Sequence, residues 1–478
     1  MGYAAVISLE DLREARNRAE FRQRLHERFD QWLDRVEAEV KEPKPTLAQL
    51  TEVVFTLRQE LTQVVTEGLL EQRYAAEQEW ERTRCPGCGQ PLRARGKAER
   101  TVETMVGALT LRRPYFYCAQ CQRGICPLDE ALELVERRKQ PDVQKAAVKL
   151  TKEVPYETAC ELFQDLTGLS LSAHTAHEVT NEVAQGLSVL EVSPSREEVE
   201  AKIAQVAEGK KWRPILVLAI DGADIPTRPE TARGRRRGRK KERAKRACWQ
   251  GQWREAKGFR FYLVDEDRLV HLISWHQIQE EEGLFEALKQ VKEAGLIPEE
   301  KVRLCVLADG ARWIWKRIKT LFPTAKEVLD YYHCSEHLHH IAQAQYKDHP
   351  HKALEWVEAT LAKLFCGEIT GVIWGLQRMK PYDEEAATEI EKGLGYLENN
   401  KGRLDYSSLR KGGYPLGSGG IESANKFICH VRLKRSGAWW YVANGNQMLA
   451  LRCAKYNGTF DRIFDRYQQK MQGEGCKK

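Results

Sequence analysis

Two pairs of cysteines constrain this chain more than any other feature, because their spacing limits how the segment around them can fold. The pairs are CPGC, with Cys85 and Cys88, and CAQC, with Cys118 and Cys121. Each pair places two thiolates on a tight turn, and four such sulfurs suit the tetrahedral coordination of Zn²⁺. The residues between the pairs alternate apolar and polar side chains around Gly107, which predicts two strands joined there. We expect a zinc ribbon with a structural Zn²⁺; the alternative is two unligated surface pairs.

The remaining cysteines and the N-terminus bear on the compartment. The N-terminus reaches charged residues before an apolar signal core can form, and no stretch approaches the roughly 18 apolar residues of a membrane span. We therefore expect a cytoplasmic protein without membrane contact, in which thirteen cysteines favour metal binding or buried thiols over disulfides. Cys126 fits the spacing of the pairs less well and is expected to lie outside the metal site.

Length and charge predict several domains and a polyanionic partner. A chain of 478 residues is too long for one hydrophobic core, and 42% hydrophobic with 30% charged residues indicates a folded protein. The net charge of +7 is local, because the segment from Thr231 to Ala247 holds ten Arg or Lys residues and one Glu. This basic tract favours a polyanion as partner, with a solvated loop as the alternative.

The N-terminal part is expected to contain three segments. Residues 1–83 read as a helical arm, broken at Lys41–Pro45 and at a turn near Gly68, that either dimerises or folds as a hairpin on its own domain. Residues 84–130 form the zinc ribbon. Residues 138–192 form a small helical domain, in which one helix follows Pro155 and ends at Gly168 and Ser172 caps the next. This pattern suits a helix-turn-helix DNA-binding domain or a plain bundle, and a linker of mixed charge from Ser193 to Lys211 is expected to follow.

The next part has an α/β order. Apolar strands are expected at 214–220 and 302–308, ending in Asp221 and Asp309, with a hairpin at 258–275 turning at 265–267 and a last strand at 326–332. Helices are expected at 280–294 and 311–322, which predicts a mixed sheet. Burying a carboxylate without a partner costs several kcal/mol, of order 3 to 5. Two aspartates at adjacent strand ends therefore favour shared divalent cations, although each alone could be a turn residue.

Four segments carry a resemblance to a known family. They are VLAIDGADIPTR with Asp221, VLADGARWIWKRIKTLFPTAKEVLDYYH with Asp309, Asp330 and His333, GSGGIESANKFICHVRLKRSGAWW with Glu422, and the upstream CxxC pairs. In this order they resemble the DDE transposases of bacterial insertion sequences, closest to the ISKra group and more distantly IS-type and Mutator-like transposases. The resemblance covers most of the chain from residue 85 onward.

The resemblance implies an RNase H-like catalytic domain, formed by residues 208–334 with the basic loop 231–247 and by residues 406–470. Residues 335–405 would be a helical insertion, whose Trp356 and Trp374 are either core or stacking groups. Asp221, Asp309 and Glu422 would hold two Mg²⁺ ions, which Mn²⁺ can replace. His333 would orient a phosphate or a ligand, or else serve as a buried hydrogen-bonding residue. Asp224 and Asp330 are expected to support these groups from behind.

The implied fold class is therefore α/β: an RNase H-like mixed-sheet domain with a helical insertion, preceded by a helical arm, a zinc ribbon and a small helical DNA-binding domain. The implied partner is double-stranded DNA, both the element's terminal repeats and the target, bound by a homodimer or higher oligomer in the bacterial nucleoid. The expected DNA-binding residues are basic: Arg235, Arg236, Arg237, Arg239, Lys240, Lys241, Lys426, Arg432, Lys434 and Arg435.

Transposition by metal-dependent cleavage and strand transfer is the expected function, and two alternatives remain open. A zinc-ribbon DNA-binding protein without catalysis would keep the cysteines and the basic tract but has no use for Glu422. An RNase H-like nuclease or resolvase would use the same acids without joining strands, because a water and a 3′-hydroxyl can be activated by the same metals.

Overall fold

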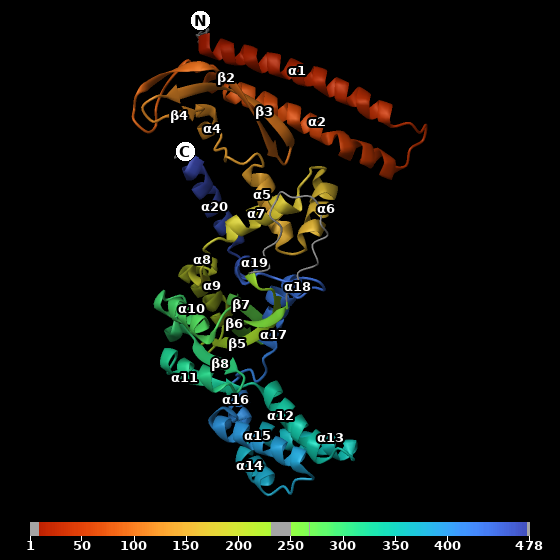
Figure 1. The fold of residues 1–478 in the computed structure, drawn as a ribbon, viewed down its shortest axis with the longest axis vertical. Helices are drawn as coiled ribbons and strands as arrows, with labels where there is room; N and C mark the ends of the chain where they lie inside the picture. Colours follow the sequence, from red (N-terminus) through yellow and green to blue (C-terminus); the bar gives the residue numbers. More distant parts are fainter. Residues whose placement is uncertain (1–8, 231–249, 267, 476–478) are drawn as a thin grey trace. The chain divides into compact units, whose positions relative to one another are not determined.

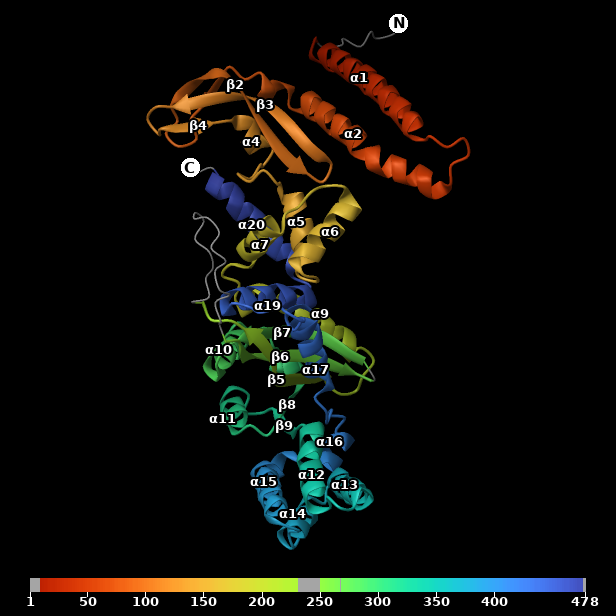
Figure 2. The ribbon, with the colours of Figure 1, turned by 45° about the vertical axis from the view of Figure 1, so that its right-hand side comes forward.

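The computed structural model describes residues 9–230, 250–266 and 268–475. Their contacts divide into two compact units, an N-terminal unit of residues 1–183 with 464–478 and an α/β unit of residues 184–463 (Figure 1, Figure 2). Within the described ranges, no helix combines the length and apolarity needed to cross a membrane. The cysteine pairs thus belong to the N-terminal unit, whereas all three predicted catalytic acids belong to the α/β unit.

The N-terminal unit begins with a helical hairpin of α1 (Leu9–Glu39) and α2 (Leu47–Arg73). The indole Nε1 of Trp32 donates to the Leu57 carbonyl at 2.9 Å. The predicted turn near Gly68 is wrong, because α2 continues through it. A Cβ at Gly68 would lie 2.1 Å from Cε2 of Phe21, so the missing side chain makes room for the ring of the facing helix. The arm also bonds within its own unit, since Arg58 donates to the Thr167 carbonyl at 2.9 Å.

A four-stranded antiparallel sheet follows the short helix α3 (Ala75–Gln78). Its strands, in spatial order, are β1 (Arg82–Arg84), β2 (Pro91–Thr104), β3 (Gly107–Cys118) and β4 (Arg123–Ile125). The predicted hairpin is confirmed, and Gly107 opens β3 at a φ of 117°, a backbone conformation that favours glycine. Leu109 and Leu111 of β3 are buried at alternate positions, as the sequence pattern predicts.

Helices complete this unit: α4 (Pro127–Ala131), α5 (Pro141–Thr151), α6 (Tyr156–Thr167), α7 (Ala173–Ala184) and the part of α20 (Phe460–Gly475) from Phe464 onward. The predicted ends of α6 and the predicted cap at the start of α7 are confirmed. Helix α6 follows Pro155 and ends at Gly168, whose φ is 74°, and the Ser172 hydroxyl accepts from the Thr175 amide at 3.1 Å. Phe163 packs with Val143 in the core of this bundle.

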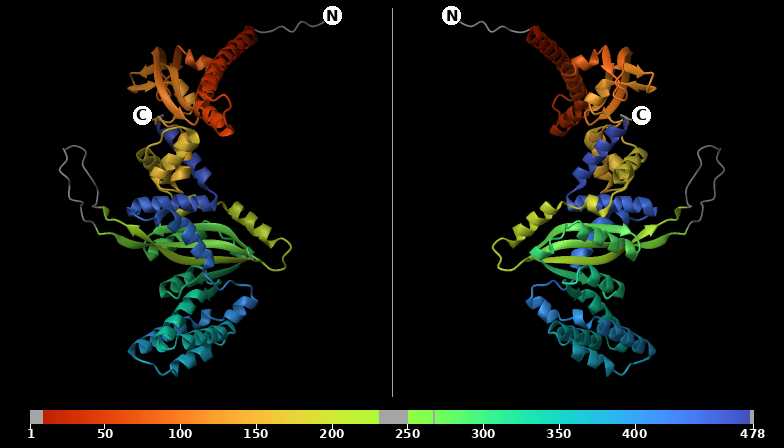
Figure 3. Two further views of the ribbon diagram at one scale, coloured as in Figure 1. Left: turned by 90° about the vertical axis from the view of Figure 1, so that its right-hand side faces the viewer. Right: turned by 90° about the vertical axis from the view of Figure 1, so that its left-hand side faces the viewer.

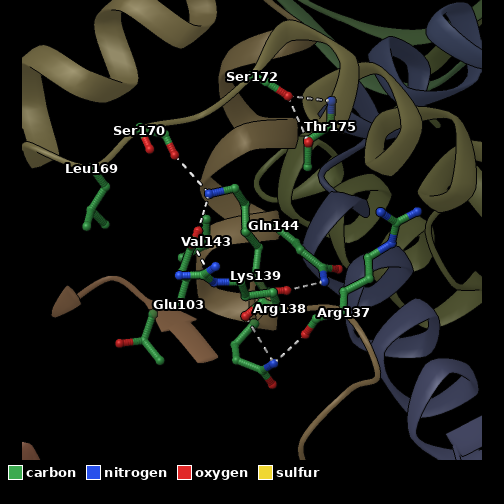
Figure 4. A network of polar contacts seen from close by, with 12 residues as sticks. Glu103, Arg137, Arg138, Lys139, Val143, Gln144, Leu169, Ser170, Ser172 and Thr175 are labelled. Carbon is green, nitrogen blue, oxygen red and sulfur yellow. Dashed lines mark hydrogen bonds and ion pairs between the residues drawn. The ribbon is translucent and has the colours of Figure 1, made fainter. Parts of the chain in front are cut away.

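A polar network ties the sheet to the helices (Figure 4). Glu103 of β2 forms ion pairs with Lys139 and with Arg138, the latter at 2.9 Å. Lys139 also donates to the Ser170 carbonyl at 2.8 Å, and its own carbonyl accepts from Gln144 at 2.7 Å. The sheet and the helical bundle are therefore parts of one compact unit.

The α/β unit starts with α8 (Val189–Val192) and α9 (Arg196–Ala207). The prediction of a linker from Ser193 to Lys211 is wrong over most of its length, because α9 lies within it. Ser195 and Glu198 form a reciprocal cap at its start, and Val199 and Ile203, one turn apart, are buried. The high density of charge on the other positions concealed this apolar face.

A five-stranded sheet forms the core of the α/β unit and confirms the predicted mixed sheet. In spatial order its strands are β7 (Arg268–Ile278), β6 (Gln252–Asp265), β5 (Ile215–Thr227), β8 (Arg303–Ala308) and β9 (Lys326–Leu329). Strand β6 pairs antiparallel with both β5 and β7, whereas β8 pairs parallel with β5 and β9 pairs parallel with β8. The prediction that the first strand ends at Asp221 is wrong, because β6 pairs with β5 as far as Thr227.

Helices cover both faces of this sheet (Figure 3). Neighbouring side chains of a strand point to opposite faces. In β6, Tyr262 lies against α17 (Gly419–Ala424), where a Cβ at Gly420 would be 2.6 Å from its Cζ. Phe261 packs instead against Phe322, with ring centroids 6.4 Å apart. Phe322 directly follows α11 (Arg312–Leu321), which with α10 (Glu281–Glu293) matches the two predicted helices. The short 3₁₀-helix η2 (Glu299–Lys301) lies between them.

The predicted helical insertion is confirmed as helical. It comprises α12 (Tyr331–Gln345), α13 (Pro350–Phe365), α14 (Ile369–Gln377), α15 (Glu384–Asn400), η3 (Lys401–Arg403) and α16 (Tyr406–Lys411). The first of these helices already begins at Tyr331, so His333 lies in its first turn. Trp374 is exposed, whereas Trp356 is partly buried near Tyr346.

The chain then returns to the sheet through α17, the π-helix η4 (Asn425–His430), α18 (Val431–Leu433) and α19 (Val442–Asn457). The wider turn of a π-helix displaces carbonyl groups from the usual α-helical pattern. Arg452 of α19 is buried, and its Nε donates to the carbonyls of Phe427 and Ile428 at 3.0 and 2.9 Å. The Arg452 guanidinium therefore stabilises the π-helix by binding two of its carbonyl groups.

We predict that Arg452→Leu destabilises the protein by about 3 kcal/mol, because it leaves two buried carbonyl groups without their donor. The measurement is the midpoint of urea unfolding. Lys455→Leu, an exposed position on the same helix, is the matched control and should change stability by less than about 0.5 kcal/mol. Equal midpoints for both variants would contradict the role of Arg452.

Candidate functional site

The register of the sheet places Asp221 and Asp309 side by side. Ala219 of β5 pairs with Leu307 of β8 in the parallel ladder. Asp221 and Asp309 each lie two residues further along, so they stand at the same level and, by the two-residue period, on the same face. Adjacent strands lie about 4.8 Å apart. The two aspartates are therefore neighbours, although Asp221 lies within its strand and Asp309 just beyond the end of β8.

Asp221 is a partly buried carboxylate whose charge is compensated by residues far along the chain. Its Oδ2 accepts from the Asn425 amide at 2.8 Å. Burial raises the pKa of Asp221 to about 6; the Gly222 amide and His333 oppose this rise, and the charges of Asp309 and Glu422 add to it. The effect of Asp309 and Glu422 on Asp221 indicates that β5, the loop after β8 and α17 bring the three acids to one place.

A row of residues across three strands supports Asp221. Asp221 pairs with Gly258, and Gly258 pairs with His276 of β7. A Cβ at Gly258 would lie 2.1 Å from Cδ2 of His276, so the glycine leaves room for the imidazole. Burial lowers the pKa of His276 to about 4, and its Nε2 lies 2.9 Å from Oδ1 of Asn425. The neutral ring thus orients Asn425, whose amide group donates to Asp221.

Asp330 links His333 to Glu422. Asp330 is buried and accepts from the His333 amide at 3.1 Å, from His333 Nδ1 at 2.6 Å and from the Ser418 amide at 2.7 Å. The Ser418 hydroxyl lies 3.1 Å from Asp330 Oδ2 and also contacts Glu422 Oε1. The expected supporting role of Asp330 has this geometric basis: one buried carboxylate orients both a histidine and, through Ser418, an acid.

His333 carries a positive charge at neutral pH. Its hydrogen bond to Asp330 raises its pKa to about 9 against the opposing effect of burial, and Asp309 contributes to the rise. The side chain is 39% exposed, so the ring remains accessible to solvent while it is hydrogen-bonded to Asp330. A cation here, beside carboxylates, suits binding of an anionic group such as a phosphate.

The loop that carries Asp309 is held on both sides. Asp309 Oδ1 accepts from the Ala311 amide at 3.0 Å, and its carbonyl accepts from Trp315 Nε1 at 2.9 Å. Tyr396 of the insertion packs against Gly310, where a Cβ would lie 2.2 Å from Cε2 of the ring. Among the residues that the structure describes, none forms a hydrogen bond with the buried Tyr396 hydroxyl, and burial together with nearby anionic groups, Asp309 among them, raises its pKa. The helical insertion therefore places the Tyr396 ring beside the loop that carries Asp309.

The donor set of these acids suits a hard divalent cation. Carboxylate oxygens are the ligands that Mg²⁺ prefers, and each carboxylate has about four lone-pair sites, so the single bonds from Asn425, Ala311 and Ser418 leave capacity for a metal. Within the described ranges, the group of three or more potential ligands whose atoms all lie within 4.8 Å of one another consists of cysteines. The three carboxylates are thus neighbours with a wider spacing than the four sulfurs.

Other predicted residues lie apart from this cluster. Asp224 is exposed and, three positions from Asp221 along β5, faces the opposite side of the sheet. Lys426, Lys434 and Arg435 are exposed, as expected of DNA-binding residues. The expectation for Arg432 is wrong, because its side chain is buried with its guanidinium carbon 5.0 Å from the centre of the Trp440 ring. The basic tract lies outside the described residues, with Arg235, Arg236, Arg237, Arg239, Lys240 and Lys241.

Sequence reasoning missed Ser418, Asn425, His276 and Tyr396. For the first two a signal was present, since they stand four residues before and three residues after Glu422 and so share its helical face. Nothing local marks His276 or Tyr396, because each becomes part of the site only through strand pairing or helix packing.

The four predicted cysteines form a second candidate site and could hold a metal ion such as zinc. Their sulfurs all lie within 4.8 Å of one another, with 3.8 Å between Cys85 and Cys121 and 3.5 Å between Cys88 and Cys118. Sulfurs about 2.3 Å from a tetrahedral zinc would be about 3.8 Å apart. Burial opposes ionisation of Cys85, but amide groups of Cys88 and Gly87 lower its pKa to about 6. The side chains of Cys88 and Cys85 raise the pKa of Cys121, so ionisation of all four thiols would require a bound cation.

We predict that Cys118→Ser abolishes metal binding at this site and destabilises the N-terminal unit, because the small core around Phe116 depends on the cross-link. Metal content per chain, measured by plasma mass spectrometry, should fall by about one ion. Cys126→Ser is the matched control, since Cys126 lies outside the four-cysteine group, and it should keep its metal. Retention of the ion by Cys118→Ser would refute this assignment.

A comparison with known families gives one match over most of the chain. The family whose model matches residues 46–470 is described as Uncharacterised protein family (UPF0236). None of the curated proteins matches the chain. The matched range includes both cysteine pairs and all three acids.

Proposed function

This chain belongs to the uncharacterised protein family UPF0236, and we propose that it is a DNA transposase that cuts the ends of a mobile element and joins them to target DNA. The observation that carries the proposal is the convergence of Asp221, Asp309 and Glu422, which come from β5, the loop after β8 and α17. Asp309 and Glu422 both add to the raised pKa of Asp221, whose main cause is burial. A protein that only binds DNA has no need for three acids gathered at one place, since each like charge disfavours the ionised form of the others.

The arrangement of the sheet supports an RNase H-like catalytic domain. Strand β5 is followed by β6 and β7 in an antiparallel meander, the parallel strands β8 and β9 then add on the other side of β5, and helices lie on both faces. The long helical insertion between β9 and α17 agrees with the resemblance to DDE transposases of bacterial insertion sequences of the ISKra group. In this proposal, Tyr396 of the insertion packs beside Asp309 and limits the space around it.

Divalent cations, Mg²⁺ or Mn²⁺, would be held by the three carboxylates, and when bound they activate a water or a 3′-hydroxyl and stabilise the departing oxygen. The chain's own residues supply the rest. Asn425 and His276 keep Asp221 in one orientation, Ser418 and Asp330 do the same for Glu422, and the charged His333 binds a phosphate oxygen. The same site then serves cleavage and joining, because both steps displace an oxygen at phosphorus.

The N-terminal unit supplies DNA binding in this proposal. A structural Zn²⁺ on Cys85, Cys88, Cys118 and Cys121 stabilises the small sheet as a zinc ribbon. Helices α6 and α7, joined by a turn that includes Gly168, have the order of a helix-turn-helix, with His174 exposed on α7. In the α/β unit, the exposed Lys426, Lys434 and Arg435 add positive charge that can contact the phosphate backbone.

The proposal predicts Mg²⁺-dependent cleavage and joining of DNA that carries the repeats flanking the gene. Asp309→Ala and Glu422→Ala should each lower both activities by more than about 100-fold, since even residues behind a metal ligand are commonly worth 10- to 100-fold. Asp224→Ala, an acid on the opposite face of the same strand as Asp221, is the matched control and should stay within about threefold of the parent protein.

Three outcomes of this assay are informative. Joined products that disappear in both variants support the transposase. Cleavage without joining would identify a nuclease or resolvase instead. Tight binding with no metal-dependent product would leave a DNA-binding protein.

Asn425 generates a second prediction. Asn425→Ala removes the donor to Asp221, so we expect the Mg²⁺ concentration for half-maximal cleavage to rise and the rate to fall about 10- to 100-fold. Asn399→Ala, an exposed asparagine of α15, is the control and should change neither quantity. A lower rate with an unchanged Mg²⁺ dependence would show that Asn425 does not act through the metal-binding acids.

A further inference from the structure

Two exposed tryptophans lie side by side on the α/β unit, away from the acids. Trp253 of β6 is 56% exposed and Trp439, which follows α18, is 37% exposed. Their ring centroids are 6.3 Å apart, with an angle of 59° between the ring planes. We call Trp253, Trp439 and the nearby Lys434 the tryptophan ledge. Indoles left this accessible keep a large apolar surface in water, which folding alone does not favour.

The ledge is held in position by its surroundings. The Trp439 ring lies across Gly251, where a Cβ would be 2.1 Å from the ring atom Cζ3, so the absence of a side chain at Gly251 lets the indole lie against the backbone. The neighbouring Trp440 is buried and donates from Nε1 to the Leu433 carbonyl at 3.0 Å. Its amide group also donates to the Pro226 carbonyl at 3.0 Å, which fixes this segment to the end of β5. Trp253 therefore lies on a paired strand, and Trp439 lies on a segment that is hydrogen-bonded to β5.

The charge around the ledge is positive. The ammonium group of Lys434 lies 5.4 Å from the centre of the Trp253 ring. The guanidinium carbon of Arg228, just beyond β5, lies 4.0 Å from the centre of the Tyr441 ring. Glu255, the acid two residues after Trp253, is paired with Lys257. Aromatic rings with cations beside them are the combination that binds single-stranded nucleic acid, in which bases stack on the rings and phosphates meet the cations.

The ledge does not share the face of the acids. Trp253 pairs with Pro226 of β5, five residues beyond Asp221. Because side chains alternate between the two faces of a sheet, Trp253 lies on the face opposite to Asp221, as Asp224 does. At about 3.3 Å per residue, the two positions also lie about 17 Å apart along the strand. The ledge is therefore a surface separate from the acids.

We infer that the tryptophan ledge binds an unpaired base of single-stranded DNA. The inference goes beyond the proposed function, because the stacking requires only an unpaired strand and no catalysis. The ledge therefore adds to the α/β unit a contact that distinguishes an opened DNA end from intact duplex.

The first test measures binding of a 15-nucleotide single strand and of the matching duplex to full-length Asp309→Ala protein without divalent cations. In this background, Trp253→Ala and Trp439→Ala should each weaken single-strand binding about tenfold and duplex binding by less than threefold. Trp253→Phe should restore most of the affinity, because a phenyl ring still stacks. Trp212→Ala, which removes a 69% exposed tryptophan that precedes β5, is the matched control and should have no effect.

Two results would overturn the inference. One is equal single-strand affinity of the two ledge variants and the control. The other is a change in sedimentation of the ledge variants with unchanged DNA binding, which would identify a contact between copies of this chain. Because the assay needs no cleavage, failure of the transposase proposal would leave this result valid, and the reverse also holds.

Stacking on the ring itself is tested separately with 2-aminopurine placed within the single strand. Its fluorescence should be quenched when the strand binds, and this quenching should be lost in Trp253→Ala. Quenching that persists in Trp253→Ala would refute stacking on this ring.

Discussion

The hydrogen bond from Asn425 to Asp221 is the interaction on which the arrangement of the α/β unit depends. Asp221 is a carboxylate inside a strand whose preceding residues are buried and apolar, and such a charge is tolerated only with partners. Its donor lies 204 residues later in the chain. Strand β5, the neighbouring strands and the helix that follows the insertion must therefore assemble together, so folding of the core and formation of the acidic cluster are one event.

The other contacts of the site follow from this requirement. Arg452 satisfies the carbonyls of the π-helix, and the π-helix places Asn425 against Asp221. Ser418 and Asp330 then connect the start of α17 to the first turn of α12, so that the two ends of the helical insertion meet at the sheet. An insertion of this size can be accommodated because its ends are held together by a buried carboxylate with several donors.

The N-terminal unit is stabilised in a different way. Its small sheet has a core of few residues around Phe116, in which the cysteines are themselves members, so a metal cross-link would replace the apolar burial that the sheet lacks. The ion pairs of Glu103 with Arg138 and Lys139 join this sheet to the helical bundle. In the proposed function, this unit recognises DNA while the α/β unit performs the chemistry, and the tryptophan ledge lies on the unit that holds the acids.

By itself, the sequence determined the local structure: the cysteine pairs and their hairpin, the caps of α6 and α7, the strands before Asp221 and Asp309, and the helices of the insertion. These depend on residue period, capping and turn residues within a few positions of each other. Only the tertiary structure decided that β5 continues past Asp221, that α2 passes through Gly68, that Arg432 is buried, and that Asn425, His276 and Tyr396 join the site. Each of these depends on strand register or helix packing between distant segments, because the partner that satisfies a buried group or fills the space beside a glycine lies far away in the chain.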